Sequence, residues 1–129
     1  MGILTVYGLS FVRLKVTLLP FSLPGFTIDR VCSLEQKLLI EARAIRPAIV
    51  CPYCQQVSAR VHSWYLRSAR DLPVNTLHVQ LRLSVRRFFC ENATCPRRTF
   101  AERLPDLVAV HAHRTQRYTE ALQVLAFAS

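Results

Sequence analysis

The chain has 129 residues, a length that accommodates one ordinary domain or a small domain with extensions. Its formal net charge is +9, and the excess lies in residues 43–118, which contain thirteen arginines, no lysine and four acidic residues. The planar guanidinium group of arginine suits bidentate contacts to phosphates and base edges. Five cysteines, an odd number, argue against a scaffold held by disulfide bonds. The composition therefore favours a nucleic-acid-binding protein and disfavours a small secreted disulfide protein.

Residues 1–47 are apolar and carry few charges. Arg13 and Lys15 interrupt the first apolar segment and no basic region precedes it, which is unlike a secretory signal. Its apolar runs fall short of the roughly 20 residues that span a bilayer, so no membrane partner is expected. We therefore expect a cytoplasmic protein, in which thiols stay reduced. Residues 1–17 are interpreted as an N-terminal extension without an assigned role.

Residues 18–47 are interpreted as an N-terminal β extension. Residues 26–32 resemble a short strand. Residues 34–45 admit two interpretations, because Ser33-Leu-Glu-Gln36 resembles a helix capping box, yet the segment could pair as a strand with residues 26–32. Of these two, the strand is preferred.

Residues 48–105 are predicted to form a zinc-binding β module. A strand is expected over residues 57–66, followed by a turn-like stretch over residues 68–75. Residues 77–86 alternate apolar and polar side chains, which predicts a strand with one buried face. The alternation breaks at residues 87–89, which indicates a bulge or twist. A short strand is expected over residues 98–101.

Residues 106–129 are interpreted as a linker and the start of a truncated helical region. A helix is predicted over residues 114–129 with Thr115 as its N-cap. Tyr118, Leu122 and Leu125 would share one face. The segment is still apolar where it ends and has no C-cap signal, which is typical of a helix cut short.

The cysteines form two close pairs, Cys51-Pro-Tyr-Cys54 and Cys90-Glu-Asn-Ala-Thr-Cys95, separated by enough chain for two strands and a turn. This spacing predicts one structural zinc ion held by Cys51, Cys54, Cys90 and Cys95 at about 2.3 Å from each sulfur. Iron, a redox disulfide and unligated thiols are the less favoured alternatives. Four sulfur ligands leave no open position for an activated water. Cys32 is expected to be a buried small hydrophobe, and His62 lies too far along its strand to be preferred as a ligand.

Arginines along the expected strands and beside the second cysteine pair are the candidate DNA-binding residues. They are Arg60, Arg67, Arg70, Arg82, Arg86, Arg87, Arg97 and Arg98. Arg82 and Arg86 would share one strand face, where positions repeat at roughly 6.7 Å, close to the spacing of successive phosphates. Trp64 and Phe88 are expected to cover a small core rather than to stack on bases. Asp71 is expected to be a turn residue or an ion-pair partner.

A series of motifs in this order resembles the zinc-finger region of the ISL-three family of insertion-sequence transposases. The motifs are Leu19-Pro20, Cys51-Pro-Tyr-Cys54, Arg60-Val-His-Ser63, Asp71-Leu-Pro73, Val85-Arg-Arg-Phe-Phe-Cys90, Asn92, Cys95-Pro-Arg-Arg98, Phe100-Ala-Glu-Arg-Leu-Pro105 and Arg114-Thr115. The resemblance implies a bacterial protein, acting on nucleoid DNA, that binds the terminal inverted repeats of its element. It also implies a zinc finger followed by a helix-turn-helix and a catalytic domain with three metal-binding acidic residues.

Only the first of these parts has a counterpart here. The chain contains eight acidic residues, and none falls in a recognisable catalytic triad. We therefore expect a non-catalytic fragment with a small α+β fold: a zinc-ribbon-like antiparallel β-sheet module with an N-terminal β extension and a C-terminal helix. DNA binding is the preferred function. The alternative is a zinc-stabilised protein-interaction module, including self-association, which the apolar helix favours.

Overall fold

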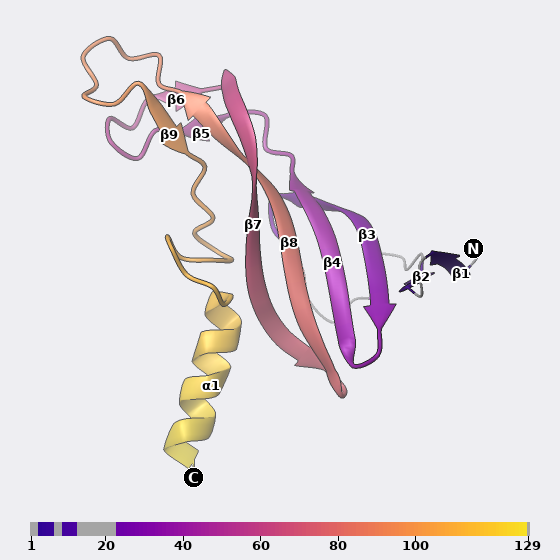
Figure 1. Ribbon diagram of the computed structural model, residues 1–129. Helices are drawn as coiled ribbons and strands as arrows, with labels where there is room; N and C mark the ends of the chain where they lie inside the picture. Colours follow the sequence, from indigo (N-terminus) through magenta and orange to yellow (C-terminus); the bar gives the residue numbers. More distant parts are fainter. Residues whose placement is uncertain (1–2, 7–8, 13–22, 129) are drawn as a thin grey trace.

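The computed structural model describes residues 3–6, 9–12 and 23–128, and within them one long β-sheet, a two-stranded sheet and one helix (Figure 1). The strands are β1 (Ile3–Val6), β2 (Leu9–Val12), β3 (Phe26–Leu34), β4 (Lys37–Ala44), β5 (Ile49–Val50), β6 (Val57–Ser58), β7 (Val61–Val74), β8 (Leu77–Phe89) and β9 (Thr99–Ala101), and the helix is α1 (Gln116–Ala128). The predicted α+β class, a β-sheet module with a C-terminal helix, is confirmed. Leu19-Pro20 and the rest of residues 13–22 lie outside the described residues.

The long sheet has the order β1-β2-β3-β4-β8-β7, and β9 pairs with the end of β8. Neighbouring strands are antiparallel except β4 and β8, which are parallel. The chain between β4 and β8 forms β5, β6 and β7, and this excursion is long enough for the crossover that parallel strands require. β3 and β4 therefore share one sheet with the β7–β8 hairpin. The preferred strand interpretation of residues 34–45 is confirmed, and Glu35 lies in the β3–β4 turn with φ of 53°.

β8 forms the centre of the main core because apolar residues occupy every second position. Val79, Leu81, Leu83 and Val85 are almost fully buried. They pack against β4 through Leu38, Ile40 and Ala42, as the strand register requires. Leu104, Leu107 and Val108 cover this face after the chain leaves β9. The predicted strand with one buried face is confirmed.

The predicted turn-like stretch over residues 68–75 is wrong. β7 continues to Val74, and the turn is at Asn75 and Thr76, where Asn75 has φ of 54°. Polar residues in this stretch suggested a turn, but alternate side chains, Ala69 and Asp71, point into the protein and are buried. The expected strand over residues 57–66 is also divided, because Val57–Ser58 form β6 and pair with β5 instead.

The predicted change in alternation at the end of β8 is real, but the bulge lies in the partner strand. β8 stays continuous, whereas the register of β7 shifts between Val61 and Ser63. From Arg86 onward the buried residues are Arg86 and Phe88, on the opposite side from Val85. β8 therefore contributes one face to the main core and, at its end, the other face to a second, smaller core.

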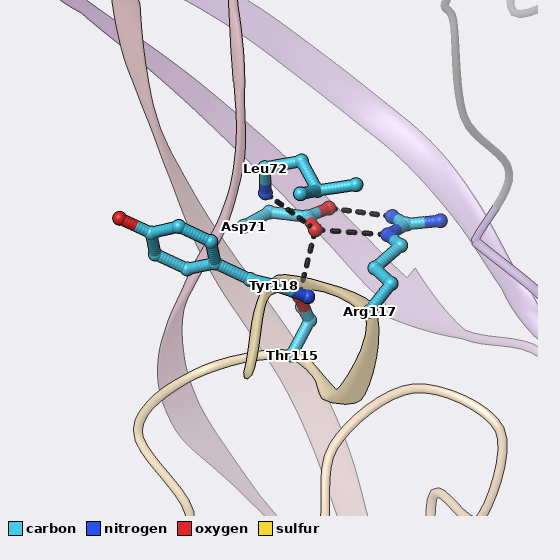
Figure 2. Close-up of polar contacts among 5 residues, drawn as sticks. All are labelled: Asp71, Leu72, Thr115, Arg117 and Tyr118. Carbon is cyan, nitrogen blue, oxygen red and sulfur yellow. Dashed lines mark hydrogen bonds and ion pairs between the residues drawn. The ribbon is translucent and has the colours of Figure 1, made fainter. Parts of the chain in front are cut away.

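The helix α1 is attached to β7 at its first turn (Figure 2). Thr115 is the N-cap as predicted, since its Oγ1 accepts a hydrogen bond from the Tyr118 amide at 3.3 Å. The same hydroxyl donates to the buried carboxylate of Asp71 at 2.7 Å, and Arg117 forms an ion pair with that carboxylate. Of the two roles expected for Asp71, it is therefore an ion-pair partner, with Arg117, and not a turn residue.

Only the start of the predicted apolar helix face is covered. Tyr118 and Leu122 are half-buried, whereas Leu125 is 66% exposed. Figure 1 shows α1 extending away from the end of the β7–β8 hairpin at which β5, β6 and β9 lie. No helix in the described part of the chain is long and apolar enough to cross a membrane.

Replacing Arg117 with alanine is expected to release the base of α1. The Asp71 side chain is 0% exposed, so without Arg117 its charge is buried with only hydroxyl and amide partners, at a cost of about 3 kcal/mol. Hydrogen exchange of the Thr115 amide, which is bonded to the Arg70 carbonyl, should accelerate on the order of 100-fold. Arg114→Ala removes an exposed arginine of the same segment and should leave that rate unchanged; equal acceleration in both variants would contradict this role for the ion pair.

Candidate metal centre and basic surfaces

The four cysteine sulfurs of the two predicted pairs come together beside the second core. The Sγ atoms of Cys51, Cys54, Cys90 and Cys95 all lie within 4.8 Å of one another. Cys51 and Cys95 are 4.0 Å apart, and Cys54 and Cys90 are 3.5 Å apart. A tetrahedral zinc with bonds of about 2.3 Å requires sulfurs about 3.8 Å apart. The observed spacing fits this ion, and the donor set of four thiols fits a closed structural site.

Two short loops present these sulfurs. Cys51 follows β5, and its loop closes through two backbone bonds, from Cys51 to the Gln56 carbonyl and from Gln55 to the Cys51 carbonyl. Gln55 has φ of 67°, in the left-handed region, which allows this tight return. Cys90 follows β8, and its amide donates to the Arg98 carbonyl. Asn92 shapes that loop because its side-chain oxygen accepts from the Thr94 amide at 3.1 Å.

Backbone amides stabilise the sulfurs as thiolates. The amides of Gln56, Asn92 and Arg97 bond to Cys54, Cys90 and Cys95 respectively, each two residues earlier in the chain. The Gln56 amide is the largest cause that lowers the pKa of Cys54 to about 7. The Asn92 amide also lowers the pKa of Cys90, but desolvation and the neighbouring sulfurs outweigh it and raise that pKa to about 12.

The opposite pKa shifts of Cys54 and Cys90 indicate that the sulfur cluster favours a bound cation. One thiol ionises readily, but further ionisation places like charges side by side. A bound zinc ion removes this repulsion and displaces the remaining protons. The four cysteines therefore hold one structural zinc ion.

The smaller core packs directly against the metal centre. Ile49, Cys51, Phe88 and Phe100 are buried together, and the other three cysteines pack against them. The Phe88 and Phe100 rings are stacked with centroids 5.9 Å apart. The expectation that Phe88 is a core residue is confirmed. Trp64 differs from expectation, because 50% of it is exposed.

Cys32 and His62, which were not expected to bind the metal, lie outside the sulfur cluster. Cys32 is buried in β3, 3% exposed, and burial raises the pKa of its thiol, so it is the buried hydrophobe that was expected. His62 is exposed on β7, where its Nδ1 lies 2.8 Å from Ser63 Oγ and its ring meets the Phe89 ring edge-on. Within the described residues, the four cysteines are the one group of three or more potential ligands that converge.

The fold and the sulfur cluster define a zinc-ribbon type of protein, in which a β-hairpin ends in two metal-binding loops. Residues 47–97 match the family model described as the zinc-finger of transposase IS204/IS1001/IS1096/IS1165. This segment, which contains all four ligands and the β7–β8 hairpin, is therefore similar to that zinc finger. No curated protein and no solved structure matches the chain.

The eight predicted DNA-binding arginines do not form one continuous face. Side chains alternate along β7 and β8, which places Arg67 and Arg87 on one face of the sheet and Arg70 and Arg82 on the other. Arg60 and Arg98 are exposed near the metal centre, and Arg60 lies over the Phe89 ring at 4.6 Å. Arg97 is exposed and lies over the Tyr53 ring at 4.8 Å.

Arg86 differs most from its expected role. It was expected to share an open strand face with Arg82, but it is 6% exposed. Its Nε and Nη2 donate to the two carboxylate oxygens of Glu102, at 3.2 and 3.0 Å. Its guanidinium also lies over the Phe88 ring at 4.8 Å and the Trp64 ring at 5.5 Å. Arg86 is therefore a structural residue, with its charge neutralised inside the protein.

A groove of about 670 Å³ lies between the metal-binding loops, the β7–β8 hairpin and the segment after β9. Its basic lining residues are Arg67, Arg87, Arg97, Arg103, His111 and His113. Arg103, His111 and His113 were not among the predicted residues. Only contacts between segments distant in sequence bring them beside Arg67, although Arg103 lies inside the Phe100-Ala-Glu-Arg-Leu-Pro105 motif and could have been included on that basis.

Proposed function

We propose that this chain is a DNA-binding zinc module of a transposase, which binds the terminal inverted repeats of a bacterial mobile element and acts on nucleoid DNA in the cytoplasm. The observation that carries the proposal is that four arginines line one groove beside a hairpin similar to a transposase zinc finger. They are Arg67, Arg87, Arg97 and Arg103. A groove of one sign of charge concentrates polyanions and accelerates their association.

We further propose that the chain performs no catalysis of its own. Four sulfur ligands saturate a tetrahedral zinc, which leaves no site for an activated water. Four acidic side chains are also held in ion pairs with arginines, which makes them poor ligands for a catalytic metal. These are Asp29, Glu41, Asp71 and Glu102.

Salt dependence of DNA binding tests the proposed function. If four arginines each neutralise one phosphate, the affinity for a terminal-repeat duplex should fall about 100-fold between about 50 and 200 mM salt, because the bound counterions are released. Fluorescence anisotropy of a labelled duplex measures this. Affinity independent of salt, or no binding at the lower concentration, would refute the proposal.

A protein-interaction module remains the second candidate, on the basis of α1. Val124, Leu125 and Phe127 are 67%, 66% and 91% exposed, and a partner could cover these apolar side chains. Sedimentation of the zinc-loaded chain without DNA distinguishes the two. Association that increases with concentration favours the interaction module, whereas a monomer that sediments faster only with DNA favours the proposed function.

A further inference from the structure

The basic groove contains no unneutralised acidic side chain. Its one acidic lining residue is Glu102, and both carboxylate oxygens of Glu102 already accept hydrogen bonds from Arg86. Arg67 uses its Nη2 on the carbonyl oxygens of Ala109 and Ala112, which orient it without cancelling its charge. The four arginines of the groove thus remain an uncompensated group of cations within the described residues.

The groove arginines are held in place by neutral partners. Arg97 lies over the Tyr53 ring, and Arg103 donates to the Tyr53 hydroxyl at 3.4 Å. Arg87 lies over the Tyr65 ring at 6.0 Å. Arg67 is partly desolvated, and both this desolvation and the charge of Arg103 lower its pKa. Cations held near one another in this way lose less side-chain entropy when an anion binds, and the anion relieves their repulsion.

The opposite face of the sheet has a different charge balance. Arg30 forms an ion pair with Glu41 at 3.1 Å, and Arg43 forms one with Asp29 at 3.2 Å. Arg70 and Arg82 also lie on this face; Arg70 lines a hollow with His113 and Arg114, and Arg43 lines a separate one with Trp64 and Ser84. Half of these four arginines are therefore already paired with carboxylates.

We propose that the groove between the metal-binding loops and the segment after β9 is the surface on which the DNA backbone binds, with Arg67, Arg87, Arg97 and Arg103 contacting successive phosphates. This inference rests on the proposed DNA binding and assigns it to one face of the sheet. It also extends the DNA-binding unit beyond the matched zinc finger, because Arg103, His111 and His113 follow residue 97. The segment after β9 would then both cover the main core and form one wall of the DNA site.

Two double variants with the same change in charge test the assignment. Arg97→Gln/Arg103→Gln removes two groove arginines, and Arg70→Gln/Arg82→Gln removes two from the opposite face. Anisotropy of a labelled mixed-sequence duplex, titrated at several salt concentrations with the zinc-loaded full chain, gives the slope of log affinity against log salt. Each lost phosphate contact reduces the magnitude of this slope by about 0.9. We expect a reduction of about 2 for the groove variant and a change near zero for the control.

The outcomes separate this inference from the proposed function. Equal reductions in both variants, or a reduction only in the control, would overturn the groove assignment while DNA binding stands. No binding by the unmodified chain would overturn both. Arg87→Gln/Arg103→Gln is a second groove variant that leaves the metal-binding loops intact, and it should show the same reduction. Zinc content of one per chain in every variant confirms that the metal centre is retained.

Discussion

Removal of zinc is expected to unfold the end of the protein that carries the metal-binding loops. Zinc bound to four thiolates contributes on the order of 10 kcal/mol to folding, which is comparable to the whole stability of a small domain. The second core cannot replace that contribution, because it consists of Ile49, Cys51, Phe88 and Phe100 with the other cysteines around it. After chelation, the amides of Gln56, Asn92 and Arg97 should lose protection from hydrogen exchange, since their acceptors are the cysteine sulfurs.

The main core serves as the internal control in this experiment, because it contains no zinc ligand. Leu81 and Leu83 are 0% exposed and lie in a cluster that contains no zinc ligand, so their amides should exchange later than those of the loops. Cys51→Ser should lower zinc retention against a chelator, whereas Cys32→Ser should not, because Cys32 lies outside the sulfur cluster. Stoichiometric zinc in Cys51→Ser, or unchanged loop protection after chelation, would disprove a structural role for the metal.

Neutralising Glu102 is expected to destabilise the folded protein strongly. The side chains of Arg86 and Glu102 are 7% and 2% exposed, so Glu102→Gln leaves a buried guanidinium without a counter-charge. Breaking a buried pair by removing one partner costs about 3 kcal/mol or more. Urea unfolding of the zinc-loaded chain measures the change. Glu120→Gln, which removes an exposed carboxylate from α1, is the matched control and should change stability by less than about 0.5 kcal/mol.

The paired replacement Arg86→Met/Glu102→Leu separates stability from DNA binding. Replacing both partners with apolar residues of similar size should recover much of the lost stability, because neither charge is then buried. If Arg86 is structural, this variant should bind DNA with the same salt dependence as the unmodified chain. A slope reduced by about 0.9 would instead mean that Arg86 contacts a phosphate in the complex.

Local chemistry explains which predictions succeeded. The four zinc ligands could be identified because two close cysteine pairs already place thiols within reach of one ion. β8 could be identified because strict alternation between Leu77 and Val85 fits only a strand with one buried face. Thr115 could be identified as an N-cap because capping involves amides only two or three residues away. In each case the interacting groups are close in sequence or follow a fixed repeat.

Contacts between residues that are distant in sequence explain the features that the sequence did not predict. Asp71 sits in a stretch that resembles a turn, yet it is buried in a strand because Arg117, 46 residues later, pairs with it. Arg82 and Arg86 occupy equivalent positions of the same alternating strand. Only Arg86 is buried, because Glu102 packs against it and forms an ion pair with it. The parallel pairing of β4 with β8 likewise depends on a crossover whose path no local pattern specifies.

The sequence by itself determined the metal, its ligands, the central strand and the positive charge, since these depend on side-chain chemistry and short-range spacing. Only the tertiary structure decided which arginines are neutralised, which face each one occupies and which segments form the groove. The physical reason is that the availability of a charge depends on the groups that surround it in space. For Arg67 and Arg86 those groups come from the segment after β9, far in sequence from the strands that it covers.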